Sequence, residues 1–119
     1  MDQYIQIETT DSGVVSIILD NKDAKLNVLS TPFMNALEEA IDTVAEQNPK
    51  AVIIRSGKPR GFVAGANIEE IEKIETSKEG YEKSRQGQTT FQKISELPMP
   101  TIAAVNGHCM GGGTEMILA

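Results

Sequence analysis

Two glycine-rich segments contain the residues best suited to chemistry in this sequence. The first, GFVAGANIEEI, covers residues 61–71, and the second, NGHCMGGGTEMI, covers residues 106–117. Each joins small residues to the predicted start of a helix. Small residues let backbone N–H groups approach a ligand closely. The first turn of a helix adds unpaired N–H donors and the positive end of the helix dipole. Both segments could therefore bind a negatively charged oxygen.

The two segments together are more informative than either one alone. If both loops face one point, they supply two N–H donors to the same oxygen, which is an oxyanion hole. Losing one such donor typically costs about 3 kcal/mol of transition-state stabilisation. Tight packing at a helix start is an alternative role for the glycines. A phosphate loop is a poorer match, because GHCMGGGT lacks the Gly-Lys-Ser/Thr ending and does not fit G-x-G-x-x-G.

The polar residues beside the second glycine run are Glu115, His108 and Cys109. Glu115 is predicted to lie in the first turn of the last helix, where a carboxylate is favoured by about 0.3–1 kcal/mol through the helix dipole. Its functional interpretation is a general acid or base beside the two donors. The apolar residues that follow it predict a partly desolvated carboxylate. His108 is interpreted as a loop or packing residue, and Cys109 as a small packed thiol, rather than as catalytic groups.

The elements that must position these loops follow from hydrophobic periodicity. Residues 4–8 and 14–19 read as a hairpin, and apolar residues at helical spacing predict a helix over 31–46, with Ser30 as its N-cap. Further elements are a strand over 51–56, a short helix marked by three isoleucines (68, 71 and 74), a helix over 78–96, a strand over 101–105, and a helix from Gly112 or Gly113 onward. Alternating strands and helices predict an α/β fold with a largely parallel sheet. Loops at the carboxyl edge of such a sheet are the usual ligand sites.

Composition limits the classes of function. The chain has 119 residues, one domain at most, and a net charge of −6 with scattered Lys and Arg, which argues against a nucleic-acid or anionic-membrane surface. No apolar run is long enough to span a membrane, and no signal peptide is visible. Cys109 and His108 are single residues of their types, so we expect no disulfide and no metal site. A cytoplasmic location is the default expectation.

The two loops together resemble the signature loops of the crotonase family, the enoyl-CoA hydratase and isomerase superfamily. The resemblance extends over essentially the whole chain. The segments KLNVLS, RSGKPRGFVAGANI and LPMPTIAAVNG are most similar to the hydratase region of multifunctional fatty-acid β-oxidation α subunits. The resemblance implies a crotonase-like ββα spiral. It also implies that residues 1–119 are the N-terminal portion of a single acyl-CoA-binding domain, incomplete because the chain stops at residue 119.

The resemblance also assigns roles to individual residues. The backbone N–H groups of Ala66 and Gly112 would form the oxyanion hole for the thioester oxygen, and Glu115 matches the first of two catalytic glutamates. The family usually has Asp at the position of Asn67, which keeps the shape of that side chain but loses its charge. The second catalytic glutamate would lie beyond residue 119. The residues implied for the CoA site are Lys25, Leu26, Ala64, Gly65, Ala66, Asn67, Ile68 and Gly112.

The activity implied for the full-length protein is hydration of trans-2-enoyl-CoA in fatty-acid β-oxidation, and this piece alone is expected to be inactive. Acyl-CoA would be the substrate, with no bound cofactor or metal. The partners implied are other copies of the chain, in a homo-oligomer, or the subunits of a β-oxidation complex, without nucleic acid. Two alternatives remain open: Δ3-Δ2 enoyl-CoA isomerisation, which can use one carboxylate, and a non-catalytic subunit that binds CoA esters or is structural.

Overall fold

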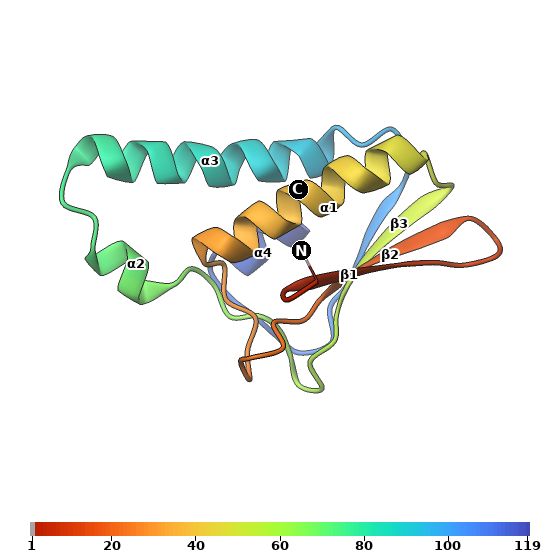
Figure 1. Cartoon of the computed structure of the whole chain (residues 1–119), viewed down its shortest axis with the longest axis horizontal. Coiled ribbons are helices and arrows are strands. Elements are labelled where there is room, and N and C mark those ends of the chain that lie inside the picture. The colour runs from red at the N-terminus through yellow and green to blue at the C-terminus, as the bar shows by residue number, and fades with distance from the viewer. Residues whose placement is uncertain (1) are drawn as a thin grey trace.

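The computed structural model describes residues 2–119 and has an α/β architecture. In chain order the elements are β1 (Ile5–Thr9), β2 (Val14–Leu19), α1 (Thr31–Gln47), β3 (Ala51–Ser56), β4 (Gly61–Val63), α2 (Ile68–Glu72), α3 (Ser77–Ser95), β5 (Thr101–Ala104), β6 (His108–Cys109) and α4 (Gly112–Ile117). Figure 1 shows the sheet at one end of the molecule, with α3 lying along α1. The predicted hairpin, helices and strands are confirmed, with bounds that differ by one or two residues.

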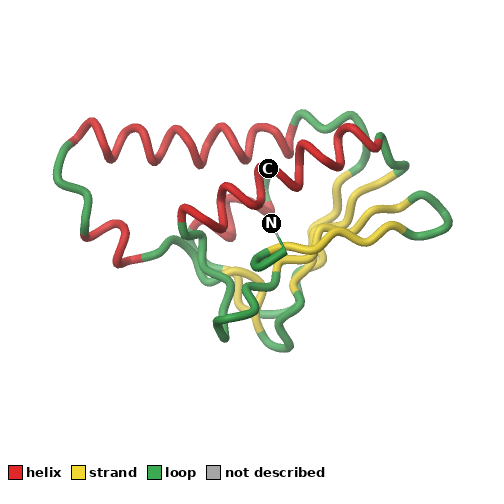
Figure 2. Tube along the Cα trace, viewed as in Figure 1, coloured by secondary structure: helices red, strands yellow, loops and turns green. Residues whose placement is uncertain are grey.

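The main sheet has the strand order β1-β2-β3-β5. β1 and β2 pair as an antiparallel hairpin, whereas β2 with β3 and β3 with β5 are parallel. The largely parallel sheet predicted from the alternation of elements is therefore confirmed. Parallel strands place their carboxyl ends at one edge, so the chain leaves β3 and β5 toward the same end of the molecule (Figure 2).

A second sheet was not predicted. β4 and β6 pair in parallel, with Gly61 opposite His108 and Val63 opposite Cys109. These strands have three and two residues, which is too short for an alternating pattern to be recognised. Both lie within the segments that we interpreted as glycine loops. Their pairing is what joins the two loops, so it matters directly for the site.

Helix α1 supplies most of the cover for the sheet. Ser30 caps its N-terminus by accepting a hydrogen bond from the Phe33 N–H at 3.3 Å, and Asn48 ends it in the left-handed conformation. The buried stripe of α1 and alternate residues of β2 and β3 belong to one hydrophobic core. These core residues are Phe33, Leu37, Ile41, Val44, Val15, Ile17, Leu19, Val52 and Ile54. Burial of this apolar stripe, rather than helix propensity, fixes α1.

Helix α3 is joined to the rest of the molecule by apolar and polar contacts, with Ile94 buried in the core and Phe91 packed against it. Its N-terminus is capped by Thr76, whose hydroxyl accepts from the Glu79 N–H. At its other end Lys93 Nζ lies 2.8 Å from Glu38 Oε1 and 3.1 Å from Asp42 Oδ1 on α1. Few residues of α3 are fully buried, as its polar sequence predicted. Residues of the part of α3 near α2 line the cavity described below, together with residues of α2 and of the start of α1.

Candidate functional site

The two glycine loops touch through their backbones. Gly65 has a φ of +124° and Gly111 a φ of +51°, conformations that favour glycine. A Cβ placed on Gly65 would lie 3.4 Å from the Met110 carbonyl oxygen, and a Cβ on Gly111 would lie 3.8 Å from the Gly65 Cα. The Met110 N–H also donates to the Val63 carbonyl at 3.0 Å. The backbone conformation thus favours glycine at both positions, and at Gly65 a Cβ would also come close to the Met110 carbonyl oxygen.

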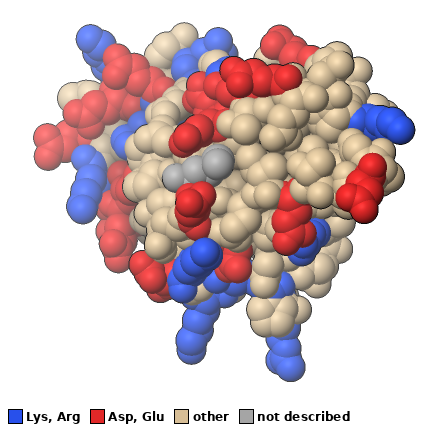
Figure 3. Space-filling view, turned by 45° about the vertical axis from the view of Figure 1, so that its right-hand side comes forward, with Lys and Arg blue, Asp and Glu red and all other residues tan. Residues whose placement is uncertain are grey.

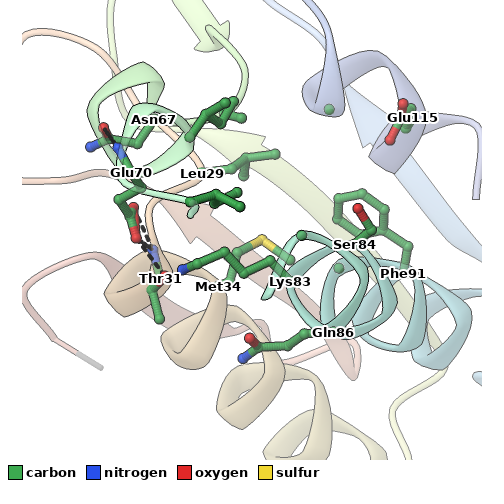
Figure 4. A pocket seen from close by; sticks show the side chains of 16 residues that line it. Leu29, Thr31, Met34, Asn67, Glu70, Lys83, Ser84, Gln86, Phe91 and Glu115 are labelled. Atoms are coloured by element: carbon green, nitrogen blue, oxygen red, sulfur yellow. Dashed lines mark hydrogen bonds between the residues drawn. The ribbon is translucent and has the colours of Figure 1, made fainter. Parts of the chain in front are cut away.

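The two residues whose N–H groups were predicted to form an oxyanion hole line the same cavity. The cavity has a volume of about 260 Å³, and Ala66, Gly112 and Glu115 all contribute to its wall (Figure 4). Within residues 2–119, neither the Ala66 N–H nor the Gly112 N–H donates a hydrogen bond to another group of the protein. Two unpaired donors at one cavity are available to an oxygen of a ligand.

The rest of the cavity wall is largely apolar. Leu29 and Met34 come from the segment that enters α1 and from α1 itself, Ile71 and Ile74 from α2 and the turn after it, and Phe91 from α3. Lys83, Ser84 and Gln86 of α3 add polar groups at one side, as Figure 4 shows. An apolar cavity with a few converging polar groups is the usual form of a small-molecule site.

Glu115 lies where the sequence placed it, but its surroundings differ from the prediction. It occupies the first turn of α4, where the dipole favours a carboxylate. The expected partial desolvation is wrong for this structure, because the side chain is exposed. The apolar residues after Glu115 point elsewhere: Met116 is buried in the core, whereas Leu118 is 80% exposed. Neighbours in sequence lie on different sides of a helix, so they do not desolvate Glu115.

Asn67 is the N-cap of α2. Its backbone is extended, and its Oδ1 accepts a hydrogen bond from the Glu70 N–H at 3.1 Å. Asn and Asp are about equally good at this position because each offers a side-chain oxygen. Asn67 therefore keeps the cap without a charge.

Glu70 is a residue of the cavity that the sequence analysis missed. Its carboxylate accepts the Thr31 N–H at 3.0 and 2.9 Å, and it also accepts the Thr31 hydroxyl. Figure 4 shows this carboxylate turned toward Thr31 at the start of α1. The signal in the sequence was a glutamate three residues after an N-cap, which is the spacing of a capping box. The partner in this case is another helix, and a local pattern cannot reveal that partner.

The remaining residues predicted for the CoA site do not all gather at this cavity. Leu26 and Ala64 line a second cavity of about 180 Å³, together with His108 and Met110. Lys25 is exposed and Ile68 is 70% exposed, and neither lines either cavity. Gly65 lies at the contact between the loops instead. The structure therefore brings together Ala66, Asn67, Gly112 and Glu115 and leaves the other predicted residues outside that group.

Asn27 is a second residue that the sequence analysis did not single out, and it is 1% exposed. Its Nδ2 donates to the Leu19 carbonyl at 2.8 Å, the Phe62 carbonyl at 3.0 Å and the Ser56 hydroxyl at 3.2 Å. Its Oδ1 accepts the Asn21 N–H at 3.0 Å. One amide side chain thus joins the ends of β2 and β3 to the middle of β4. The only signal in the sequence was a polar side chain between the apolar residues of KLNVLS.

Cys109 fits the interpretation as a packed thiol. Its side chain is half-buried against the core. Burial raises the pKa of the Cys109 thiol, and a hydrogen bond with Thr114 offsets part of that shift. Reactive cysteines need the opposite, a lowered pKa. His108 is exposed on β6.

Two searches of the described residues gave negative results. Among residues 2–119, no group of three or more His, Cys, Asp or Glu side chains is placed to hold a metal ion. Over the same residues, none of the helices combines the length and apolar character needed to cross a membrane.

Two curated proteins that are similar to this chain are α subunits of the fatty acid oxidation complex. The α subunit of the fatty acid oxidation complex from Aliivibrio fischeri is 36% identical over 111 residues, which is 92% of this chain and 16% of that protein. The corresponding subunit from Shewanella halifaxensis is 32% identical over 120 residues, 100% of this chain and 17% of that protein. The chain therefore spans about one sixth of the length of these curated relatives.

A solved structure confirms the crotonase-like fold. The enoyl-CoA hydratase from Bacillus anthracis superposes with a TM-score of 0.85 at 31% identity, covering 98% of this chain and 45% of that one. The sequence profile described as "Enoyl-CoA hydratase/isomerase" matches residues 9–119. This match covers far more than half of the chain, and the relatives exceed 30% identity over nearly all of it. The chain belongs to the enoyl-CoA hydratase/isomerase family.

Proposed function

We propose that this chain is the N-terminal portion of an acyl-CoA-binding domain that hydrates trans-2-enoyl-CoA thioesters. The observation that carries the proposal is that one cavity is lined by Glu115 together with Ala66 and Gly112, whose N–H groups donate no hydrogen bond within residues 2–119. The family membership supplies the substrate class. We propose the full-length protein as a cytoplasmic enzyme that assembles with copies of itself or within a fatty-acid oxidation complex.

The proposed chemistry uses each of these groups once. A water molecule adds its oxygen to C3 of the enoyl thioester while the C2–C3 π electrons move toward the thioester carbonyl. The oxygen of that carbonyl becomes negatively charged, and two N–H donors stabilise it. Glu115 accepts a proton from the attacking water. C2 then takes up a proton, which restores the thioester and gives the 3-hydroxyacyl product. A second carboxylate, from outside the residues described, would supply the proton to C2.

Basic side chains support binding of a CoA ester. Lys22, Lys25 and Arg60 are exposed on the loops 20–26 and 57–60. Lys58 joins these loops, because its Nζ lies 2.7 Å from Asp20 Oδ1 and donates to the Asn21 carbonyl at 2.6 Å. Figure 3 shows Lys and Arg side chains projecting from the lower end of the molecule, where these loops lie. In a chain of net charge −6, such a cluster suits the phosphates of CoA.

Exposed apolar side chains support the proposal that the chain is part of a larger domain. Ile102 on the outer strand β5 is 53% exposed, Met110 in the second loop is 61% exposed, and Leu118 after α4 is 80% exposed. Exposed large apolar side chains of this kind suit contacts with another part of a protein. The solved relatives, of which this chain covers less than half, have additional chain that could cover it.

Isomerisation of Δ3-enoyl-CoA to the Δ2 isomer is a second candidate that one observation favours. Two carboxylates line the cavity, but that of Glu70 is engaged by Thr31. Among the described residues, Glu115 is thus the carboxylate of the cavity that is available for proton transfer. Moving a double bond requires one group that carries a proton between two carbons, whereas hydration as proposed uses two groups.

Assay of the full-length protein on crotonyl-CoA and on a 3-enoyl-CoA tests both proposals. We expect loss of the conjugated enoyl thioester and formation of the 3-hydroxyacyl-CoA. The Glu115→Gln variant should lower kcat by about 10²–10⁴-fold, as expected for loss of a general acid–base group, with a much smaller change in KM. Double-bond migration without hydration would favour the isomerase. Tight binding of acetoacetyl-CoA without turnover of either substrate would favour a non-catalytic binding subunit.

A further inference from the structure

The carboxylates of Glu70 and Glu115 differ in their hydrogen bonding. The Glu115 side chain is exposed and has no hydrogen-bond partner within residues 2–119. Both oxygens of Glu70 accept hydrogen bonds from Thr31, at 3.0 and 2.9 Å from its N–H, and one of them also accepts the hydroxyl. A carboxylate held in this way is an acceptor with a fixed orientation. Glu70 is therefore poorly placed to transfer protons and well placed to hold α2 against α1.

The Glu70 contact is the last of three that join two segments of the chain. The Ala64 N–H donates to the Asn27 carbonyl at 2.9 Å, and the Leu29 N–H donates to the Gly65 carbonyl at 2.7 Å. The Thr31 N–H then donates to Glu70. Segments 27–31 and 64–70 thus run alongside one another and are joined by hydrogen bonds at both ends. Ala66 lies between the second and third contacts.

Helix α1 is a firm reference for this arrangement. Its 17 residues bury an apolar stripe in the core, and its first turn is capped independently by Ser30. The Glu70 carboxylate meets the positive end of its dipole, where a negative charge is stabilised. Glu70 is also fixed from its own side, because its N–H donates to Asn67 Oδ1. A rigid helix, a carboxylate and a cap therefore determine the path of the loop that contains Ala66.

We propose that Glu70 is a positioning residue, which orients the Ala66 N–H toward the cavity by tying the start of α2 to the N-terminus of α1. The inference rests on the proposed function of Ala66 as an oxyanion donor. Without the Glu70 carboxylate, the loop keeps its hydrogen bonds at residues 64 and 65 and the parallel bridge between Ala66 and Leu29, but it loses the contact that holds the start of α2 beyond Ala66. The donor then has a wider range of orientations, and misplacement of a catalytic group by about 1 Å can cost about 100-fold in rate.

Steady-state kinetics of the full-length protein test the proposal. Glu70→Ala should lower kcat on crotonyl-CoA by about 10–100-fold and change KM by less than about threefold, because an oxyanion donor acts mainly in the transition state. Glu69→Ala is the matched control, since Glu69 is its exposed neighbour on the same helix. Thr31→Ser keeps both donors to Glu70 and should retain near-normal kcat. A kcat for Glu70→Ala equal to that of Glu69→Ala would overturn the proposal.

A second control separates positioning from simple weakening of α1. Ser30→Ala removes the other N-cap contact of the same helix, which joins Ser30 to Phe33 and not to the loop. We expect Ser30→Ala to lower the melting temperature without a comparable fall in kcat, measured well below that temperature. Equal losses of kcat in Ser30→Ala and Glu70→Ala would mean that Glu70 is merely structural, which contradicts the proposal.

A measurement without turnover keeps this inference distinct from the proposed function. In ¹⁵N-labelled protein, Glu70→Ala should shift the amide resonance of Ala66, while Glu69→Ala leaves it unchanged. If wild-type protein neither hydrates nor isomerises enoyl-CoA, the proposed function fails, and the Ala66 amide still decides whether Glu70 holds the loop. An unchanged Ala66 amide in Glu70→Ala would overturn the inference even in an active enzyme.

Discussion

Replacing Asn27 by leucine tests whether one buried amide joins the segments that position the site. Asn27 is 1% exposed and contacts the ends of β2 and β3 and the middle of β4 through its side chain. Its own carbonyl accepts the Ala64 N–H at 2.9 Å, which is the first contact between segments 27–31 and 64–70. Leucine has a similar branched shape but no donor or acceptor. Asn27→Leu therefore removes the polar contacts with little loss of volume.

The expected loss of stability follows from counting these contacts. The amide has two protons for three acceptors, so its donated bonds count as two, and the bond that it accepts from the Asn21 N–H makes three. At about 1 kcal/mol net for each bond, the loss is about 3 kcal/mol. The Leu19 carbonyl keeps the Gly57 N–H and the Ser56 hydroxyl keeps the Lys58 N–H, so these two groups are not orphaned.

Urea denaturation followed by circular dichroism measures this loss. With an m value of about 1.5 kcal/mol/M, the midpoint should fall by about 2 M. Asn106→Leu is the matched control, because exposed Asn106 donates to the Lys58 carbonyl at 2.8 Å where water can take its place. It should cost less than about 1 kcal/mol. A midpoint for Asn27→Leu no lower than that of Asn106→Leu would refute the reasoning.

Four further predictions concern other residues. Gly107→Ala should lower the free energy of unfolding by about 1–3 kcal/mol, because its Cβ would lie 2.4 Å from the Arg60 carbonyl oxygen. Gly87→Ala should raise it by up to about 1 kcal/mol, since this helical position has open space; thermal melts compare the two. Hydrogen bonds to Glu38 and Asp42 raise the pKa of Lys93. The stability that these hydrogen bonds contribute should therefore be present at neutral pH and be lost as the pH rises above about 10.5, where Lys93 loses its proton. In Lys93→Met this loss of stability at alkaline pH should be absent. An equal loss in the variant would contradict its attribution to Lys93. The raised pKa of Cys109 predicts slower alkylation by iodoacetamide at pH 7.5 than for free cysteine, and equal rates would contradict its burial.

The sequence predicted the main elements well because each has a strong local signal. The stripe of Phe33, Leu37, Ile41 and Val44 has helical spacing, and all four residues are buried in α1. The strand predicted over 51–56 has those bounds in the structure. These patterns arise from burial of one face, which depends on the period of the element alone. Tertiary partners were not needed to recognise them.

The contacts that build the site were harder to predict because they join distant segments. β4 and β6 have no alternating pattern, yet their pairing brings residues 61–63 to residues 108–109. The partners of Glu70 and Asn27 are 39 and up to 35 residues away in sequence. The side of α4 that carries Glu115 also depends on what the helix packs against, which is why its predicted desolvation was wrong. Local periodicity contains none of this information.

The structure shows what the asparagine at position 67 changes relative to the aspartate that is usual in the family. An aspartate at this position would offer the same oxygen to the Glu70 N–H, so the cap does not require a charge. The Glu70 carboxylate already meets the positive end of the α1 dipole, and the donor proposed at Ala66 is a backbone N–H rather than a side chain. A second carboxylate three residues before Glu70 would add repulsion between like charges. Loss of charge at residue 67 therefore leaves the proposed oxyanion donor intact, so it gives no reason to prefer the non-catalytic alternative.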